Sequence, residues 1–161
     1  MTATAHAIVA GAIYRAIPNP AFSVPLAFAS HFIMDAMPHW DFGTNWRKRS
    51  KTQTGMLAIA ETVIGITLAY FLFQGKGDSL PLLATIIASE LPDWMEAPWY
   101  IFFANKNKHK PKKRAGFWEK LAYRIYQTEN IFHAKTDAPF GIFTQIATVG
   151  FFLLLLNQNT V

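Results

Sequence analysis

The segment MLAIAETVIGITLAYFLF, residues 56–73, carries one charged residue, Glu61, in 18 positions. A helix needs roughly 20 predominantly apolar residues to cross about 30 Å of hydrocarbon, so this segment approaches the length of a transmembrane helix. The segment PFGIFTQIATVGFFLLLL, residues 139–156, has the same length and no charged residue. Three shorter apolar stretches complete the pattern, at residues 3–17, 21–37 and 80–91.

The five apolar segments predict an all-α protein. No part of the chain alternates apolar and polar residues over the length of a strand. We therefore expect one domain, residues 1–161, folded as an integral membrane bundle of about five transmembrane helices. Its 16% charged residues lie well below the roughly 25% of ordinary soluble domains. The aromatic-rich residues 94–103 have three open interpretations: they span the membrane, re-enter it or lie at its interface.

The basic residues give the bundle an orientation. All but two of the 15 lysines and arginines fall in residues 38–55 and 104–138, and the exceptions are Arg15 and Lys76. With five spans, these two loops and the N-terminus share one side, which the positive-inside rule places in the cytoplasm. A soluble helical bundle has no reason to sort its charges by alternate loops. We expect a multi-pass protein of the inner (plasma) membrane.

The net charge of +5 indicates an anionic neighbour, either lipid head groups or nucleic acid. The most basic run, Lys106–Arg114, lacks the interleaved aromatic residues on which bases stack. We therefore expect contact with anionic membrane lipids and no nucleic-acid partner.

Ionisable side chains inside apolar helices are costly in a membrane and mark functional sites by default. The predicted topology brings nine of them to the same cytoplasmic depth: His6, His31, Asp35, His39, Asp41, Glu61, Glu90, Asp93 and His133. The outer half offers only Arg15, Thr67 and Gln145, which argues against a transport pathway.

The densest group lies in SHFIMDAMPHWD, residues 30–41. His31 and Asp35 are four residues apart and share one helix face. Pro38 ends the helix and lets His39 fold back over that face. A hydrogen-bonded pair of His31 and Asp35 that joins two helices is the simpler interpretation of these two residues alone.

Taken with the other histidines, the cluster predicts a divalent-metal site. The expected ligands are His6, His31, Asp35, His39, Asp93 and His133. Mixed imidazole and carboxylate ligands suit zinc, our first expectation, or manganese or iron, rather than calcium. A metal would also supply the positive charge that buried acids require. Zero cysteines exclude thiolate ligands and disulfides.

Glu61 and Glu90 are the candidate catalytic residues, because a carboxylate beside the ligands can move protons. Glu61 is open to two other interpretations, as a metal ligand or as one partner of a hydrogen bond between helices.

Three motifs resemble the membrane-bound metal-dependent hydrolases of bacterial inner membranes: AHAIVAG at residues 5–11, SHFIMDAMPHWD, and ASELPDW at residues 88–94. The His-x-x-x-Asp element is also similar to a metal-binding piece of zinc-dependent phospholipase C. The first resemblance implies that His6, His31, Asp35 and Asp93 are site positions, with His39 and Glu90 as companions.

The chain departs from these hydrolases in one element. Their His-Arg-Gly-x-Thr-His-Ser sequence is absent, and the nearest counterpart is TENIFHA, residues 128–134, where Ala134 follows His133. If the missing histidines are ligands, the active site is reduced or differently built, which affects catalysis more than metal binding.

The predicted function is metal-dependent hydrolysis, in which the metal lowers the pKa of a bound water. Location and resemblance together imply a phosphoester or lipid-like substrate. The alternative is a non-catalytic membrane protein whose His/Asp cluster is structural or carries metal ions or protons.

Overall fold

The computed structural model describes residues 1–43, 48–75, 77–105 and 110–157, and these form helices and no named strand. The all-α prediction is confirmed. The elements are α1 (Ala3–Ala16), α2 (Pro20–Asp35), α3 (Lys51–Phe73), α4 (Ser79–Pro98), the π-helical turn η2 (Trp99–Phe103), α5 (Phe117–Phe132) and α6 (Phe140–Asn157). The predicted basic loops include residues 44–47 and 106–109, which lie outside the described residues.

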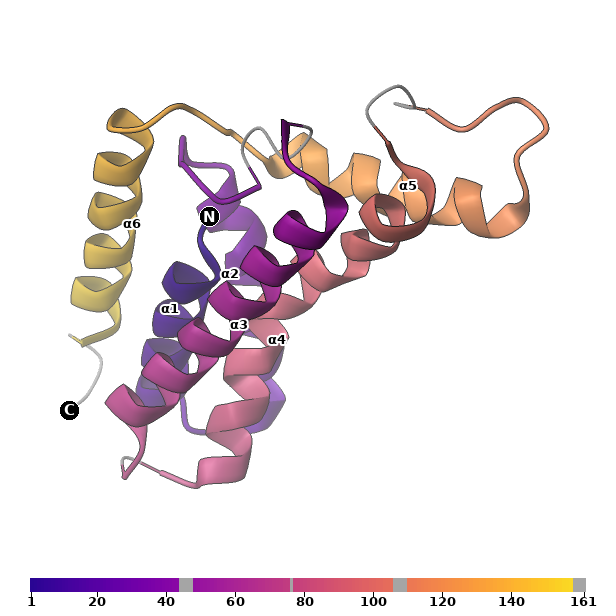
Figure 1. The fold of residues 1–161 in the computed structure, drawn as a ribbon. Helices are drawn as coiled ribbons and strands as arrows, with labels where there is room; N and C mark the ends of the chain where they lie inside the picture. Colours follow the sequence, from indigo (N-terminus) through magenta and orange to yellow (C-terminus); the bar gives the residue numbers. More distant parts are fainter. Residues whose placement is uncertain (44–47, 76, 106–109, 158–161) are drawn as a thin grey trace.

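Five of these helices run in alternating directions (Figure 1). α1, α3 and α6 descend from the end of the bundle that holds the N-terminus, whereas α2 and α4 return to it. α5 projects sideways from that same end, and the C-terminal end of α6 lies at the opposite one. The segments 36–43 and 133–139 therefore meet beside the start of α1.

α1 is the central helix and packs against α2, α3, α4 and α6. Its sequence is rich in alanine, and most of its residues are buried. Small side chains let the helix backbones approach closely. At Gly65 of α3, an added Cβ would lie 2.9 Å from the Cα of Thr4. This close crossing of α1 and α3 sets the depth at which the first turn of α1 meets its neighbours.

Local signals explain where two helices begin. The Asn19 side chain accepts a hydrogen bond from the Ala21 amide, and Pro20 occupies the first helical position, so α2 starts there. Ser50 and Gln53 form a reciprocal capping box that starts α3 at Lys51, five residues before the predicted apolar segment.

α4 and α5 differ from the prediction. The apolar stretch 80–91 does not end at Pro92: α4 continues through it to Pro98 and is followed by η2, so residues 94–103 are helical. α5 lies inside the segment 104–138, which was predicted as a loop. Its Tyr123 and Tyr126 pack on Trp99 at helical spacing, and this aromatic cluster stabilises a helix whose other face is charged.

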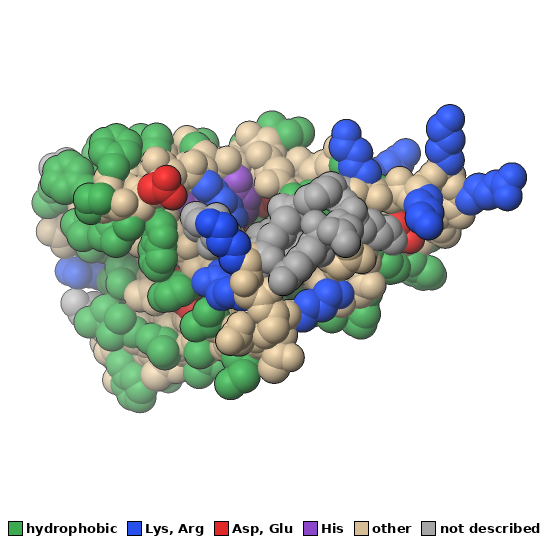
Figure 2. All heavy atoms as spheres, turned by 45° about the horizontal axis from the view of Figure 1, so that its top comes forward, with side chains coloured by type: hydrophobic (Ala, Val, Ile, Leu, Met, Phe, Trp, Pro, Cys, Tyr) green, Lys and Arg blue, Asp and Glu red, His purple; other side chains and the backbone are tan. Residues whose placement is uncertain are grey.

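Among the described residues, α3 and α6 are the helices long and apolar enough to cross a membrane, judged by length and composition alone. A core helix of a soluble protein can pass the same test, but it is mostly buried, whereas only 11% of each apolar window is buried here. Figure 2 shows hydrophobic side chains spread over the bundle and lysines and arginines gathered toward the side on which α5 projects. Two such helices support association with a membrane. The five spans predicted from the sequence are not confirmed.

Candidate metal centre

Three helices bring four of the predicted ligands together. His6 lies near the start of α1, His31 and Asp35 near the end of α2, and Asp93 toward the end of α4. The rings of His6 and His31 stack with centroids 4.0 Å apart, and His6 Nε2 lies 3.1 Å from Asp35 Oδ1. The amino group of Met1 also contacts Asp35. Four of these five residues are buried, and Asp93 is partly exposed.

Backbone pairing between two segments positions the other two predicted ligands, His39 and His133. The segment after α2 runs beside the segment after α5: the His39 amide donates to the Ala134 carbonyl at 3.0 Å, and the Thr136 amide donates to the His39 carbonyl at 2.8 Å. The Ala134 amide also donates to the Asp35 carbonyl at 2.9 Å. This pairing places His133 Nε2 against Asp35 Oδ2 and brings its ring to 5.6 Å from that of His39.

The ring nitrogens of His31 and His39 reveal what the cluster requires. Nδ1 of His31 lies 2.7 Å from the Ser89 carbonyl, and Nδ1 of His39 lies 2.8 Å from the Met37 carbonyl. A carbonyl only accepts, so each Nδ1 carries a proton, and a neutral ring would present its lone pair at Nε2. Outer-shell carbonyls orient metal-binding histidines in this way.

These lone pairs point at other acceptors. Nε2 of His31 faces Asp35 Oδ2 at 3.5 Å and Asp93 Oδ1 at 3.7 Å, and Nε2 of His39 faces Asp35 Oδ1 at 3.8 Å and Asp41 Oδ2 at 3.5 Å. Neither Nε2 has a hydrogen-bond partner among the described residues. Buried acceptors facing one another require a cation or a proton between them, so the donor set fits a metal ion.

All six predicted ligands converge. They fall into two groups, His6 with His31 and Asp93, and Asp35 with His39 and His133, and within each group the candidate ligand atoms lie within 4.8 Å of one another. These buried groups could hold a metal ion. The identity of the metal comes only from the chemistry of the ligands, which favours zinc, manganese or iron.

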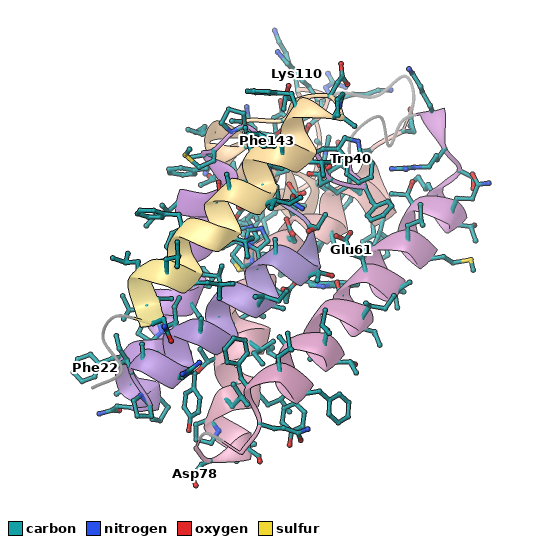
Figure 3. The ribbon with its side chains drawn as sticks, turned by 90° about the vertical axis from the view of Figure 1, so that its left-hand side faces the viewer. Phe22, Trp40, Glu61, Asp78, Lys110 and Phe143 are labelled. Atoms are coloured by element: carbon teal, nitrogen blue, oxygen red, sulfur yellow. The ribbon has the colours of Figure 1, made fainter. Side chains whose placement is uncertain are left out.

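Glu61 and Glu90 lie outside both groups. Glu61 Oε1 accepts a hydrogen bond from the Ala3 amide at 2.8 Å and so satisfies an N–H at the start of α1. Figure 3 shows Glu61 between α3 and the start of α1. Glu90 is 2% exposed, and neither of its carboxylate oxygens has a hydrogen-bond partner among the described residues.

A pocket of about 630 Å³ adjoins the centre, between the first half of α3, the second half of α4 and the segment that follows α2. Asp41, Asp93 and Lys135 line its polar side, together with Glu61. Most of the remaining accessible lining is apolar, with Ala58, Ile59, Trp94, Ala97 and Ile101 among its residues, and Arg49, Lys51 and Glu96 are further charged residues on the walls. The pocket can therefore take a molecule that has both charged and apolar parts.

Asp41, which was expected at this depth but not as a ligand, and Lys135 lie next to the two groups. Lys135 Nζ lies 3.1 Å from Asp41 Oδ2. Burial opposes ionisation of Asp41, but its contact with His39 and the charge of Lys135 outweigh burial and hold the pKa of Asp41 below its usual range. Burial also disfavours the Lys135 ammonium, but Asp41 and Glu96 nearby raise the pKa of Lys135 overall. The pair stays ionised at the edge of the pocket.

Glu129 is a further buried acid, and it was hidden in the sequence by the expected loop 104–138. It lies on α5 and is 6% exposed. Burial raises the pKa of Glu129 to about 7, and of its charged neighbours His31 opposes this shift while Asp93 and Asp35 add to it. The amphipathic spacing of Tyr123, Tyr126 and Glu129 was the available signal for a helix there.

Comparison of the chain with protein-family models, curated proteins and solved structures finds no match. The resemblance to membrane-bound metal-dependent hydrolases thus remains a prediction from the quoted motifs. The geometry of the site carries the functional argument.

Proposed function

We propose that the protein is a metal-dependent hydrolase of the inner membrane that acts on a phosphoester or lipid-like substrate. The observation that carries the proposal is the pair of fully buried histidines, His31 and His39, whose Nδ1 atoms are tied to backbone carbonyls while their Nε2 lone pairs face carboxylates. Zinc is the expected metal, and when bound it lowers the pKa of a coordinated water so that hydroxide is available near pH 7.

The chain's own residues have distinct parts in this proposal. His6, His31, Asp35, His39, Asp93 and His133 hold the metal. Lys135, kept charged beside Asp41, faces the pocket and can pair with an anionic group of the substrate. Glu61 lines the pocket and Glu90 is buried nearby on α4, and we assign both the task of holding or moving a proton.

The form of the pocket supports an amphiphilic substrate. Its polar side adjoins Asp93 and Lys135, whereas Ile59 and Ile101 contribute apolar wall. Ile59 is on α3, one of the two helices suited to cross a membrane, and its side chain is exposed on the outer surface of the bundle. A phosphoester head group would lie beside the metal ligands, and an apolar chain would lie along α3 and α4.

Metal analysis combined with hydrolysis tests the proposal. Detergent-purified protein is expected to contain zinc and to cleave a chromogenic phosphodiester or a fluorescent phospholipid, with activity lost to a chelator and restored by zinc. The variant His31→Ala should lose both metal and activity. Ser23→Ala is the matched control, because Ser23 is buried on the same helix and bonds Thr85.

Two outcomes would contradict the proposal. Equal metal content in wild type and His31→Ala would show that the metal is not bound by the His/Asp cluster. Bound metal without hydrolysis of either substrate would favour the alternative, in which the cluster is structural or carries ions.

A further inference from the structure

We propose that the six ligands form two metal positions with Asp35 as the bridge between them. The inference rests on the metal site of the proposed function and concerns how many ions that site takes. It starts from the two ligand groups, each of which contributes three donors from separate parts of the chain.

The number of donors exceeds what one zinc ion uses. Zinc sites in proteins are almost always four-coordinate, and catalytic ones use three protein ligands and leave one position open. Six donors around a single zinc would leave two or more of them without a partner. Two ions use every donor in the cluster. With Asp35 as the bridge, the first ion has four protein ligands, and the second has three, Asp35, His39 and His133, and one open position.

Asp35 lies between the groups in a way that suits a bridging carboxylate. Its Oδ1 is 3.1 Å from Nε2 of His6 and 3.8 Å from Nε2 of His39, and it also contacts the amino group of Met1, which an ion bound there would replace. Its Oδ2 is 3.5 Å from Nε2 of His31 and also contacts His133. Each oxygen therefore faces one histidine from each group. In two-metal hydrolytic sites the ions lie about 3.5–4 Å apart, a separation that one carboxylate can bridge.

The backbone carbonyls that orient the histidines are also divided between the two groups. The Ser89 carbonyl orients His31 in one group, and the Met37 carbonyl orients His39 in the other. Both histidines are fully buried, and Nε2 of each has no hydrogen-bond partner among the described residues. Each position thus has one pre-oriented imidazole of its own, as expected for two sites rather than one site with spare ligands.

Metal stoichiometry tests this inference. Metal-free protein is loaded with Zn²⁺, freed of excess metal by gel filtration and analysed for zinc per chain. We expect about two ions in wild type, about one in each of His6→Ala and His39→Ala, and less than one in Asp35→Ala. Asp78→Asn is the control and should retain two, because Asp78 is exposed at the opposite end of the bundle from Trp40 (Figure 3).

Loading with Mn²⁺ gives a second readout that does not depend on activity. Electron paramagnetic resonance of wild type should show an exchange-coupled pair of ions, and each single-histidine variant should show an isolated ion. Circular dichroism identifies any variant that does not fold, in which case His6→Gln and His39→Gln replace the alanine variants.

The two proposals fail differently. One zinc per chain in wild type, or loss of all zinc in both histidine variants, would overturn the two-metal arrangement even if the protein hydrolyses its substrate. Two zinc ions without hydrolysis would overturn the proposed activity and leave the two-metal arrangement standing.

Discussion

At the scale of single residues, the cluster holds several buried polar atoms that lack a hydrogen-bond partner among the described residues, Nε2 of His31 and Nε2 of His39 among them. His31 and His39 each donate the N–H at Nδ1 to a backbone carbonyl, and the Asp35 carboxylate can only accept hydrogen bonds. An unpaired buried polar group costs about 1–3 kcal/mol, so several of them in one place would lower the free energy of unfolding substantially. A bound cation would remove this cost, so under the proposed function the metal would also stabilise the fold.

Glu129 leads to a prediction about pH. Its pKa in the folded protein is about 7, above the usual value of 4.5, because burial penalises the carboxylate. The folded state therefore holds this proton more tightly than the unfolded state, and stability falls as pH rises from about 4.5 to about 7. Glu129→Gln should raise the melting temperature relative to wild type at pH 8.

The critical measurement is how the difference in melting temperature between Glu129→Gln and wild type changes with pH. The advantage of Glu129→Gln over wild type should shrink as the pH is lowered from 8 to 5, where Glu129 is protonated in the folded protein. Melting curves of chelator-treated protein in detergent at both pH values provide it, since chelation removes the contribution of metal binding. A difference that stays constant with pH would show that Glu129 titrates normally.

At the scale of helices, close packing connects the fold to the site. Gly65 of α3 lies against the backbone of Thr4, where an added Cβ would be 2.9 Å from both the nitrogen and the Cα. The backbone of α1 must shift to accept it, and overpacking of this kind costs about 1–3 kcal/mol. Gly65→Ala should therefore destabilise the protein and weaken zinc binding, because His6 follows Thr4 by half a turn.

Gly55 offers the matched control in the same helix. An added Cβ at Gly55 meets nothing within 4 Å, so Gly55→Ala should gain up to about 1 kcal/mol from helix propensity. Chemical denaturation and zinc titration of both variants measure the contrast. Equal stability of the two variants would mean that α1 and α3 do not pack as closely as the structure has them.

The helices were predictable to different degrees. Long apolar runs indicated α3 and α6, but nothing apolar marks Lys51–Gly55, which is helical because Ser50 and Gln53 form a capping box. α5 was not predicted, because its one lysine and one arginine were assigned to a loop and its stabilising contact with Trp99 is made across the fold. The predicted apolar stretch stops at residue 91, yet α4 continues through Pro92 and carries Asp93.

The ligands were predictable as a set but not as an arrangement. His31 and Asp35 share a helix face by spacing alone, and the topology suggested a common depth for His6, Asp93 and His133. The pairing of His39 with Ala134 joins segments far apart in the sequence and leaves no local signal, so the division into two groups came from the structure.

At the scale of the whole molecule, the question is how many helices cross the membrane. Five helices alternate in direction (Figure 1), as a five-span protein requires. At 1.5 Å per residue, α3 with 23 residues is about 34 Å long, whereas α1 with 14 residues is about 21 Å long and short of the roughly 30 Å hydrocarbon core. α1 can still lie at membrane depth because α2, α3, α4 and α6 surround it.

The cysteine-free chain allows a direct test of this topology, because each introduced cysteine is the only reactive thiol. If all five helices cross, Asp78, before α4, and Lys113, before α5, lie on opposite sides of the membrane. In intact cells a membrane-impermeant maleimide should therefore label Asp78→Cys and leave Lys113→Cys unlabelled until the cells are opened. If only α3 and α6 cross, both positions fall on the same side and label alike, so one pair of variants separates the two topologies.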